Sequence, residues 1–312
     1  MTPMIYYSII IPHHNTPHLL QRLIDTIPQR EDIEIIVVDD NSVDDKKADI
    51  SRPDVKTIFI DKEHTRGAGH ARNIGMDAAT GKWLLFADSD DFYKPNFIHV
   101  LDEYRDDDIE MLFWNVESVD SDTLLPGKVN RSLYHQKMIE NYDGSENSKN
   151  NLLFLGFGPW RKMLLTSYVK KYGFQFEEIP KDNDHLFSLE TSYFAKNWKV
   201  DNRVLYVLTF CEGSITYGNM TKDKYIAHFL TLRRRSKLYC YMGHPEWNKR
   251  CVRGRYFQSG VYYCYKMFKK KPKEGLRAML YYITNFISIE IKSNYYVEVF
   301  ERLKTKNKAF LQ

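Results

Sequence analysis

The sequence predicts an α/β fold with a mostly parallel sheet, flanked by helices and followed by a helical C-terminal extension. Three observations lead to this prediction. Short apolar runs alternate with amphipathic stretches from residue 6 to residue 87, which is the pattern of βαβ units. Two of these runs pass directly into acidic residues, as strands do when they end at the rim of an open sheet. From Tyr225 onward the pattern becomes helical and basic.

The first strand is expected at Tyr6–Ile11, a β-branched run closed by Pro12. A helix should follow, because Thr16 suits an N-cap, Pro17 suits the first turn, and apolar residues recur at helical spacing. Residues 117–151 are polar and predict a loop with one helix. Further strands are expected at 33–38, 55–60, 82–87, 111–116 and 204–210, and further helices at 71–79, just after 162 and from 186.

Composition and charge divide the chain into two regions. Residues 225–312 carry a net charge of +14, whereas the rest carries −10. We therefore expect a catalytic domain at residues 1–222 and a basic, mainly helical region at 223–312. The four cysteines lack metal-binding spacing, the start lacks a signal-peptide pattern, and no run approaches the roughly 20 apolar residues of a membrane span. A cytoplasmic protein is expected.

Acidic residues follow two of the expected strands. Leu84–Ala87 runs into Asp88, Ser89, Asp90 and Asp91, and the strand at 33–38 runs into Asp39 and Asp40. Carboxylates this close repel one another, and a hard cation such as Mn²⁺ or Mg²⁺ would hold them together while leaving positions for phosphate oxygens. The alternative is a polar turn in which Ser89 or Asp91 caps the next helix.

Four motifs in this order give the chain its resemblance to the family 2 glycosyltransferases. They are Ser8-Ile-Ile-Ile-Pro12-x-x-Asn15, Ile36-Val-Val-Asp39-Asp40-Asn41-Ser42-x-Asp44, Gly69-x-Ala71-Arg72-Asn73-x-Gly75 and Asp88-Ser89-Asp90-Asp91. The match covers about residues 5–100 and continues weakly to about residue 215. The resemblance implies a GT-A fold and transfer of a sugar from a nucleoside diphosphate donor with inversion at the anomeric carbon.

The resemblance also implies roles for the acids at the strand ends. Asp40, with Asp39 nearby, would hold the nucleotide base, and Pro12 would line the same pocket. A carboxylate that accepts from an imide N–H favours uracil, although guanine also offers an N–H edge. The ribose and diphosphate side would be formed by Asp88 and Ser89, and the metal would be bound by Asp88 and Asp90.

Asp184 is the general base that the resemblance implies, since a sugar hydroxyl needs a carboxylate to take its proton. Asp182 competes for this role, because Asn183 stands where the family usually has Glu. Arg72 would either touch the diphosphate or brace the acids. Trp160 would either stack on an acceptor sugar or pack under its turn.

Two other motifs carry less weight. Adjacent His13 and His14 point to opposite faces of an extended segment, which argues against a metal pair. The family usually has an aromatic residue at position 14, so base stacking there is not expected. Gly67-x-Gly69 lacks the third glycine of a dinucleotide fingerprint, because Arg72 stands at that position.

The function expected from the sequence is metal-dependent transfer from a UDP-sugar to a glycan or lipid-linked glycan, in the synthesis of a surface polysaccharide. Alternatives are a sugar nucleotidyltransferase and a catalytically silent carbohydrate-binding protein. The basic C-terminal region has three interpretations: adhesion to an anionic inner membrane face, a solvated helical surface, or nucleic-acid binding. The acidic catalytic half argues against nucleic acid.

Overall fold

The computed structural model describes residues 4–127, 129–210 and 221–244, with single residues and short pairs between 264 and 305. The chain divides into two compact units. Met1–Glu178 and Asn183–Gly218 form the first unit, and Ile179–Asp182 and Asn219–Gln312 form the second. The functional division expected at residue 222 stays a prediction.

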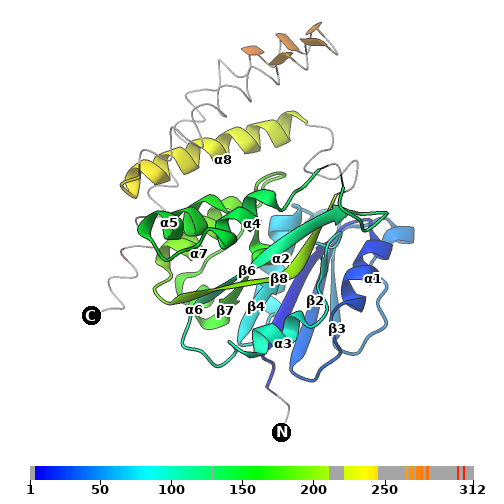
Figure 1. Cartoon of the computed structure of the whole chain (residues 1–312). Helices are drawn as coiled ribbons and strands as arrows, with labels where there is room; N and C mark the ends of the chain where they lie inside the picture. The colour runs from blue at the N-terminus through cyan, green and yellow to red at the C-terminus, as the bar shows by residue number, and fades with distance from the viewer. Residues whose placement is uncertain are drawn as a thin grey trace. The chain divides into compact units, whose positions relative to one another are not determined.

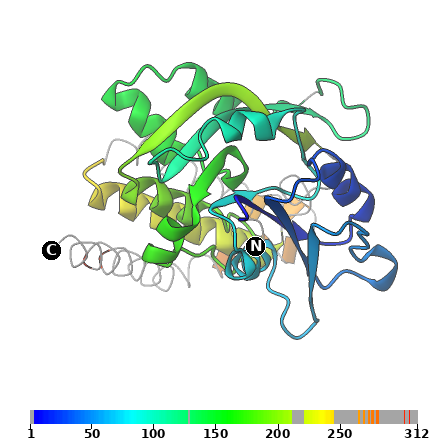
Figure 2. The same cartoon turned by 90° about the horizontal axis from the view of Figure 1, so that it is seen from below.

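The first unit contains a mixed sheet with the order β3-β2-β1-β4-β7-β6-β8-β5. Its strands are β1 Tyr7–His13, β2 Ile33–Asp40, β3 Val55–Ile60, β4 Trp83–Phe86, β5 Phe92–Tyr93, β6 Met111–Asp120, β7 Lys162–Leu165 and β8 Trp198–Phe210. The first four strands pair in parallel, and β7 pairs antiparallel with both β4 and β6. The blue N-terminal strands therefore lie side by side at one end of the sheet (Figures 1 and 2).

Helices and 3-10 turns connect the strands. They are α1 Pro17–Asp25, η1 Asp44–Lys46, α2 Ala68–Ala78, α3 Phe97–Asp102, α4 Leu133–Glu140, α5 Glu146–Leu155, η2 Pro159–Arg161, α6 Thr166–Tyr172, α7 His185–Phe194 and, in the second unit, α8 Lys222–Tyr241. In the described part of the chain, no helix combines the length and apolar character that a membrane crossing requires.

Alternate residues of the buried strands face two different helix layers. Ile9 and Ile11 of β1 belong to a core that also contains apolar residues of α1 and α3. Ile10 points the other way, toward α2, where a Cβ on Gly75 would come within 2.4 Å of its side chain. Both faces of β1, β2 and β4 are buried, as the uninterrupted apolar runs predict.

The structure corrects several expectations about single elements. Residues 117–151 contain the end of β6, helix α4 and the first part of α5, in place of a loop with one helix. The strands β5 and β7 were not expected. Helix α2 begins at Ala68, three residues earlier than predicted, and Thr16 precedes α1 without a side-chain capping bond.

Candidate active site

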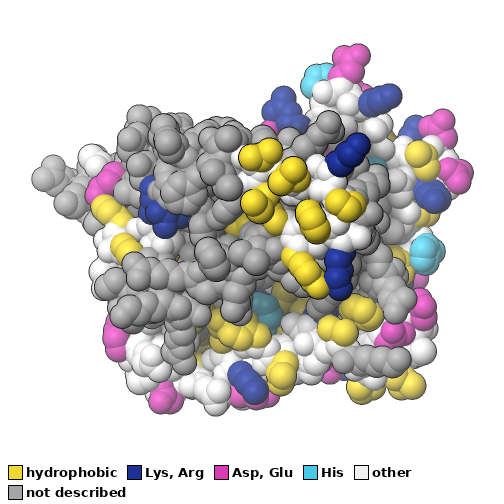
Figure 3. Space-filling view, turned by 90° about the horizontal axis from the view of Figure 1, so that it is seen from above, with side chains coloured by type: hydrophobic (Ala, Val, Ile, Leu, Met, Phe, Trp, Pro, Cys, Tyr) yellow, Lys and Arg dark blue, Asp and Glu magenta, His cyan; other side chains and the backbone are white. Residues whose placement is uncertain are grey.

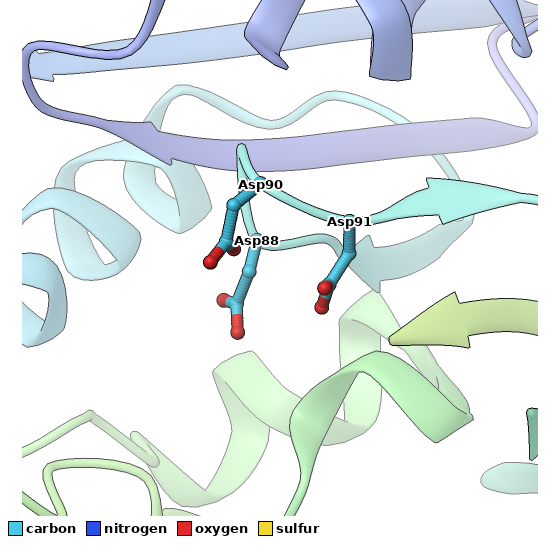
Figure 4. Close-up of side chains that lie close together, drawn as sticks. All are labelled: Asp88, Asp90 and Asp91. Carbon is cyan, nitrogen blue, oxygen red and sulfur yellow. The ribbon is translucent and has the colours of Figure 1, made fainter. Parts of the chain in front are cut away.

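Three carboxylates gather in the turn that follows β4. One oxygen from each of Asp88, Asp90 and Asp91 lies within 4.8 Å of the others. The turn is closed by the Asp91 amide, which donates to the carbonyl of Asp88 at 3.0 Å. Figure 4 shows the side chains of Asp88 and Asp90 next to each other, with Asp91 beside the start of β5. The Ser89 hydroxyl lies 3.3 Å from that of Thr16.

Asp91 belongs to the framework of this turn. Its side chain is fully buried and accepts from the Thr209 amide at 2.7 Å and the Tyr206 hydroxyl at 3.2 Å. Burial, with the charge of Asp90 beside it, raises the pKa of Asp91 well above its ordinary value. Asp91 therefore joins the turn to β8 and does not cap a helix, since Asn96 precedes α3.

The backbone of Asp90 is fixed by two residues that the motif analysis missed. Arg22 donates to its carbonyl at 2.6 Å, and the Thr209 hydroxyl donates to the same oxygen at 2.5 Å. No local pattern announces these contacts, because they join residues far apart in the sequence. Burial and the neighbouring Asp88 charge raise the pKa of Asp90.

The cluster fits a hard divalent cation. All of its side-chain donors are carboxylate oxygens, which Mg²⁺ and Mn²⁺ prefer. Burial, and secondly the charge of Asp88, raise the pKa of Asp90, and a bound cation would offset both effects. Asp88 and Asp90, which are both partly exposed, are the residues that would hold the cation.

Arg72 braces the cluster, which is one of the two roles expected for it. Its guanidinium donates to Asp88 Oδ1 at 2.5 Å and to Asn183 Oδ1 at 2.9 Å. The Arg72 side chain is 7% exposed and lies over the ring of Phe176. A charge-assisted bond in so buried a place holds Asp88 firmly. It also joins the β4 turn to the segment before Asp184.

Asp39 and Asp40, at the end of β2, have different surroundings. The carboxylate of Asp39 is buried and accepts from the amides of Ser42 and Ala48, at 2.8 and 2.9 Å. These bonds lower its pKa against the opposing effect of burial. Asp40 instead accepts from the Thr65 hydroxyl at 2.7 Å and the Gly67 amide at 2.9 Å. Asp39 orders its own loop, whereas Asp40 faces the start of α2.

Pro12 and His13 lie beside the end of β2, because β1 pairs in parallel with β2. Pro12 pairs with Val38, and His13 with Asp39. The His13 ring contacts Asp39 at 3.0 Å and accepts from the Thr16 amide at 3.2 Å, so both ring nitrogens have partners within the protein. Burial lowers the pKa of His13. This histidine is a structural residue and not a metal ligand.

The two candidates for the base belong to different units. Asp184 immediately precedes α7 in the first unit, and its side chain is 27% exposed. Asp182 lies in the second unit, where its carboxylate is 2.5 Å from the His228 ring. This contact occupies Asp182 and favours Asp184, whose role as the base stays a prediction.

Trp160 packs under its turn in this structure. Its ring is stacked on Tyr206, with centroids 5.8 Å apart, and His135 meets it edge-on at 4.9 Å. The residue is 7% exposed and belongs to the main apolar core. This packing favours the second of the two roles that the sequence left open, and acceptor binding stays a prediction.

A comparison of the sequence with known families identifies the chain. Residues 8–163, half of the chain, match the family model described as "Glycosyl transferase family 2". The chain belongs to glycosyl transferase family 2. The matched region contains β1 from Ser8 onward, β2 to β4, the acidic turn and Arg72, so the resemblance seen in the motifs is confirmed.

Curated relatives of this family 2 chain include two that align over different lengths. "Putative glycosyltransferase EpsH" of Bacillus subtilis is 26% identical over 215 residues, covering 64% of this chain and 59% of the relative. "GalNAc(5)-diNAcBac-PP-undecaprenol beta-1,3-glucosyltransferase" of Campylobacter jejuni is 36% identical over 90 residues, covering 27% and 29%. The alignments span less than two thirds of such relatives, 37%, 59% and 35% for three of them.

A solved structure shares the fold of this family 2 chain. It is Staphylococcus aureus TarS 1–349 in complex with UDP-GlcNAc, which superimposes with a TM-score of 0.62 at 18% identity. The superposition covers 99% of this chain and 92% of that one. The expected GT-A fold, a mixed sheet flanked by helices, is therefore confirmed.

Proposed function

We propose that the first unit transfers a sugar from a UDP-sugar to a hydroxyl of a glycan or lipid-linked glycan, with inversion and with a divalent cation. The observation that carries this proposal is the link through Arg72. One guanidinium contacts Asp88 of the acidic turn and Asn183, the neighbour of Asp184. The bridge connects the acidic turn to the residue next to Asp184, and the proposed reaction needs the metal-bound leaving group and the base close together.

We assign each residue of the site a chemical role that agrees with its surroundings. Asp88 and Asp90 would hold Mn²⁺ or Mg²⁺, which supplies charge neutralisation for the departing diphosphate. Arg72 adds a fixed positive charge beside Asp88. Asp184 would take the proton of the acceptor hydroxyl, a contribution of about 10²–10⁴-fold to the rate. An inverting transfer needs one such base.

The preference for UDP is proposed from Asp40. Its two oxygens each accept one bond within the protein, which leaves lone pairs for the imide N–H of uracil. Pro12 would line the same pocket, and Asp39 would contribute by shaping its wall. TarS, whose structure is in complex with UDP-GlcNAc, supports a UDP-sugar as the donor. The name of the Campylobacter relative, a glucosyltransferase with an undecaprenol-linked acceptor, supports a lipid-linked acceptor.

A lipid-linked acceptor leads to a second part of the proposal, in which the second unit adheres to an anionic membrane face. Among the described residues of this unit, five apolar side chains are between 47% and 55% exposed: Tyr265, Phe268, Leu276, Met279 and Leu280. Lysines lie among them, and Lys269 is 5.0 Å from the Tyr265 ring. Figure 3 shows hydrophobic side chains gathered beside Lys or Arg side chains on this face. Such a mixture suits an interface of headgroups and acyl chains.

Thermal unfolding with nucleotides tests the donor site. UDP with Mn²⁺ should raise the melting temperature more than UDP alone, and more than GDP or CMP with Mn²⁺, because the cation links the diphosphate to Asp88 and Asp90. Asp90→Asn should abolish the additional shift given by Mn²⁺. The proposal fails if no nucleotide stabilises the protein, or if the stabilisation by UDP is the same after EDTA treatment.

A further inference from the structure

The segment that leads to Asp184 is attached to α2 at several points. Asn73 donates to the Phe176 carbonyl at 3.0 Å and accepts from the Phe176 amide at 2.8 Å. A Cβ on Gly69 would lie 2.0 Å from the Glu177 carbonyl oxygen. The Glu177 amide in turn donates to the Asn183 carbonyl at 3.1 Å. Phe176 and Glu177 are thereby held against α2, and Asn183 is bonded to Glu177.

The side chain of Asn183 adds the contact nearest to Asp184. Its Oδ1 accepts from Arg72 Nη1 at 2.9 Å, while Arg72 Nη2 donates to Asp88 Oδ1 at 2.5 Å. A guanidinium is planar and rigid, so its two bonds fix the direction of Asn183 relative to Asp88. The residue beside the expected base is thus tied to a residue expected to bind the cation.

The neutral amide at this position matters because the charges nearby are negative. Asp88, Asp90 and Asp91 already lie within 4.8 Å of one another. A carboxylate at 183 would keep a bond to Arg72, but it would also compete with Asp88 for the guanidinium charge and repel an arriving diphosphate. An amide oxygen accepts the same bond without adding charge.

We propose that Asn183 is a positioning residue, which acts through Arg72 to hold Asp184 at a fixed place relative to the acidic turn. This inference rests on the proposed function for its chemistry, and on the Arg72 bridge for its geometry. A base displaced by about 1 Å costs up to about 10²-fold in rate, while contacts to the donor are unchanged. Loss of the Asn183 side chain should therefore lower kcat and leave the donor KM near its original value.

The kinetic test compares Asn183→Ala, Asn183→Asp and the control Asn202→Ala, which removes an exposed amide of β8. UDP release is measured with the best of UDP-glucose, UDP-galactose and UDP-N-acetylglucosamine. Asn183→Ala should lose about 10–100-fold in kcat with the KM within about threefold. Asn183→Asp should recover much of kcat, because it keeps the bond, but raise the KM. A raised KM in Asn183→Ala, or an unchanged kcat, would overturn the inference.

Hydrogen–deuterium exchange tests the geometry without relying on transfer. In the full-length protein, Asn183→Ala should speed exchange at the amides of residues 177–184 about 10-fold or more, whereas Asn202→Ala should not. Unchanged exchange would show that Arg72 does not fix this segment, even if transfer is observed. If exchange is faster in Asn183→Ala but the original protein releases no UDP from any of these sugars, the inference that Asn183 fixes this segment is supported. The proposed function is then contradicted.

Discussion

Asp182 and Asp184 are only two positions apart, yet their side chains have different partners and belong to different units. Asp182 adopts a positive φ of 59° and contacts His228, whereas Asp184 ends the segment held by Arg72. Sequence spacing alone cannot separate two such acids, because both precede the same apolar helix. Contact with residues about 50 or more positions away is what distinguishes them.

Asp184→Asn should therefore remove transfer and keep nucleotide binding. We expect a loss of about 10²–10⁴-fold in UDP release, with the thermal shift from UDP and Mn²⁺ unchanged. Asp182→Asn is the matched control, and its transfer rate should stay within about threefold of the original. If Asp182→Asn abolishes transfer while Asp184→Asn retains it, the assignment of the base is wrong.

Glu190, on α7, is a buried acid that the proposed chemistry does not use. It is 6% exposed, and burial raises its pKa from 4.5 to about 8. The folded state therefore keeps a proton that the unfolded state loses above pH 4.5. The resulting contribution to stability is full below about pH 4.5 and is lost as the pH rises through about 8.

Glu190→Gln should remove this pH dependence, since an amide stays neutral. We expect the variant to be more stable than the original at pH 8.5, by about 2–5 kcal/mol, and to differ little at pH 4.5. Urea unfolding at the two pH values measures the difference, with the exposed Glu140→Gln as the control. Equal stability of Glu190→Gln and the original protein at pH 8.5 would contradict the burial argument.

At the scale of elements, the sequence predicts the N-terminal half of the sheet well because β1, β2 and β4 are buried on both faces. Their apolar residues therefore run without interruption, and the sequence predicts buried strands there. The strand β7 has only four residues directly after a 3-10 turn, and β5 has two, so neither leaves a recognisable period. Helix α4 is not recognised because only Met138 and Ile139 are buried, and α5 because its first half is mostly polar and its apolar residues are consecutive, at residues 152–155.

In the candidate site, the local sequence predicts the acids but not their distant hydrogen-bond partners. The acids Asp39, Asp40, Asp88 and Asp90 are predicted because the first two end β2 and the other two come just after β4. The partners that give them distinct roles come from elsewhere: the amides of the loop after β2 for Asp39, and Arg72 for Asp88. The framework role of Asp91 depends on β8, which lies more than a hundred residues later.

Helix α2 contacts both Asp88 and the segment that leads to Asp184. A substitution at Gly69 of this helix tests how closely the two must pack. Gly→Ala inside a helix ordinarily stabilises by about 0.5–1 kcal/mol. Here the new Cβ would meet the Glu177 carbonyl, so we expect Gly69→Ala to destabilise by about 1–3 kcal/mol and to lower transfer. Asp77→Ala, on the exposed face of α2, should leave both unchanged. If Gly69→Ala is more stable than the original protein, the backbone at Glu177 can move away from α2 at little cost.

At the scale of the whole molecule, the acidic and basic parts of the sequence correspond to different tasks in our proposal. The net +14 of residues 225–312 would be drawn to anionic lipid, while the acids of the first unit would bind a cation and repel that surface. The proposal thus explains why the two parts of the sequence carry opposite net charges.

Flotation with liposomes tests the membrane part of the proposal. The protein should float with vesicles that contain phosphatidylglycerol, and weakly or not at all with pure phosphatidylcholine, because lysines provide part of the attraction. Binding should fall at 0.5 M NaCl and should fall further in Phe268→Ser/Leu276→Ser. Leu125→Ser, an exposed apolar residue of the first unit, should bind as the original does. Equal binding to neutral vesicles would contradict an electrostatic contribution.

The different surroundings of Asp39 and Asp40 bear on how enzymes of this kind diversify. One acid of the pair is committed to the loop after β2 through the Ser42 and Ala48 amides, while its neighbour contacts Thr65 and Gly67. If Asp40 holds the nucleotide base, as we propose, residues around it can be exchanged to change the nucleotide preference without altering the bonds of Asp39. Directed evolution of donor preference should begin at residues 65–67.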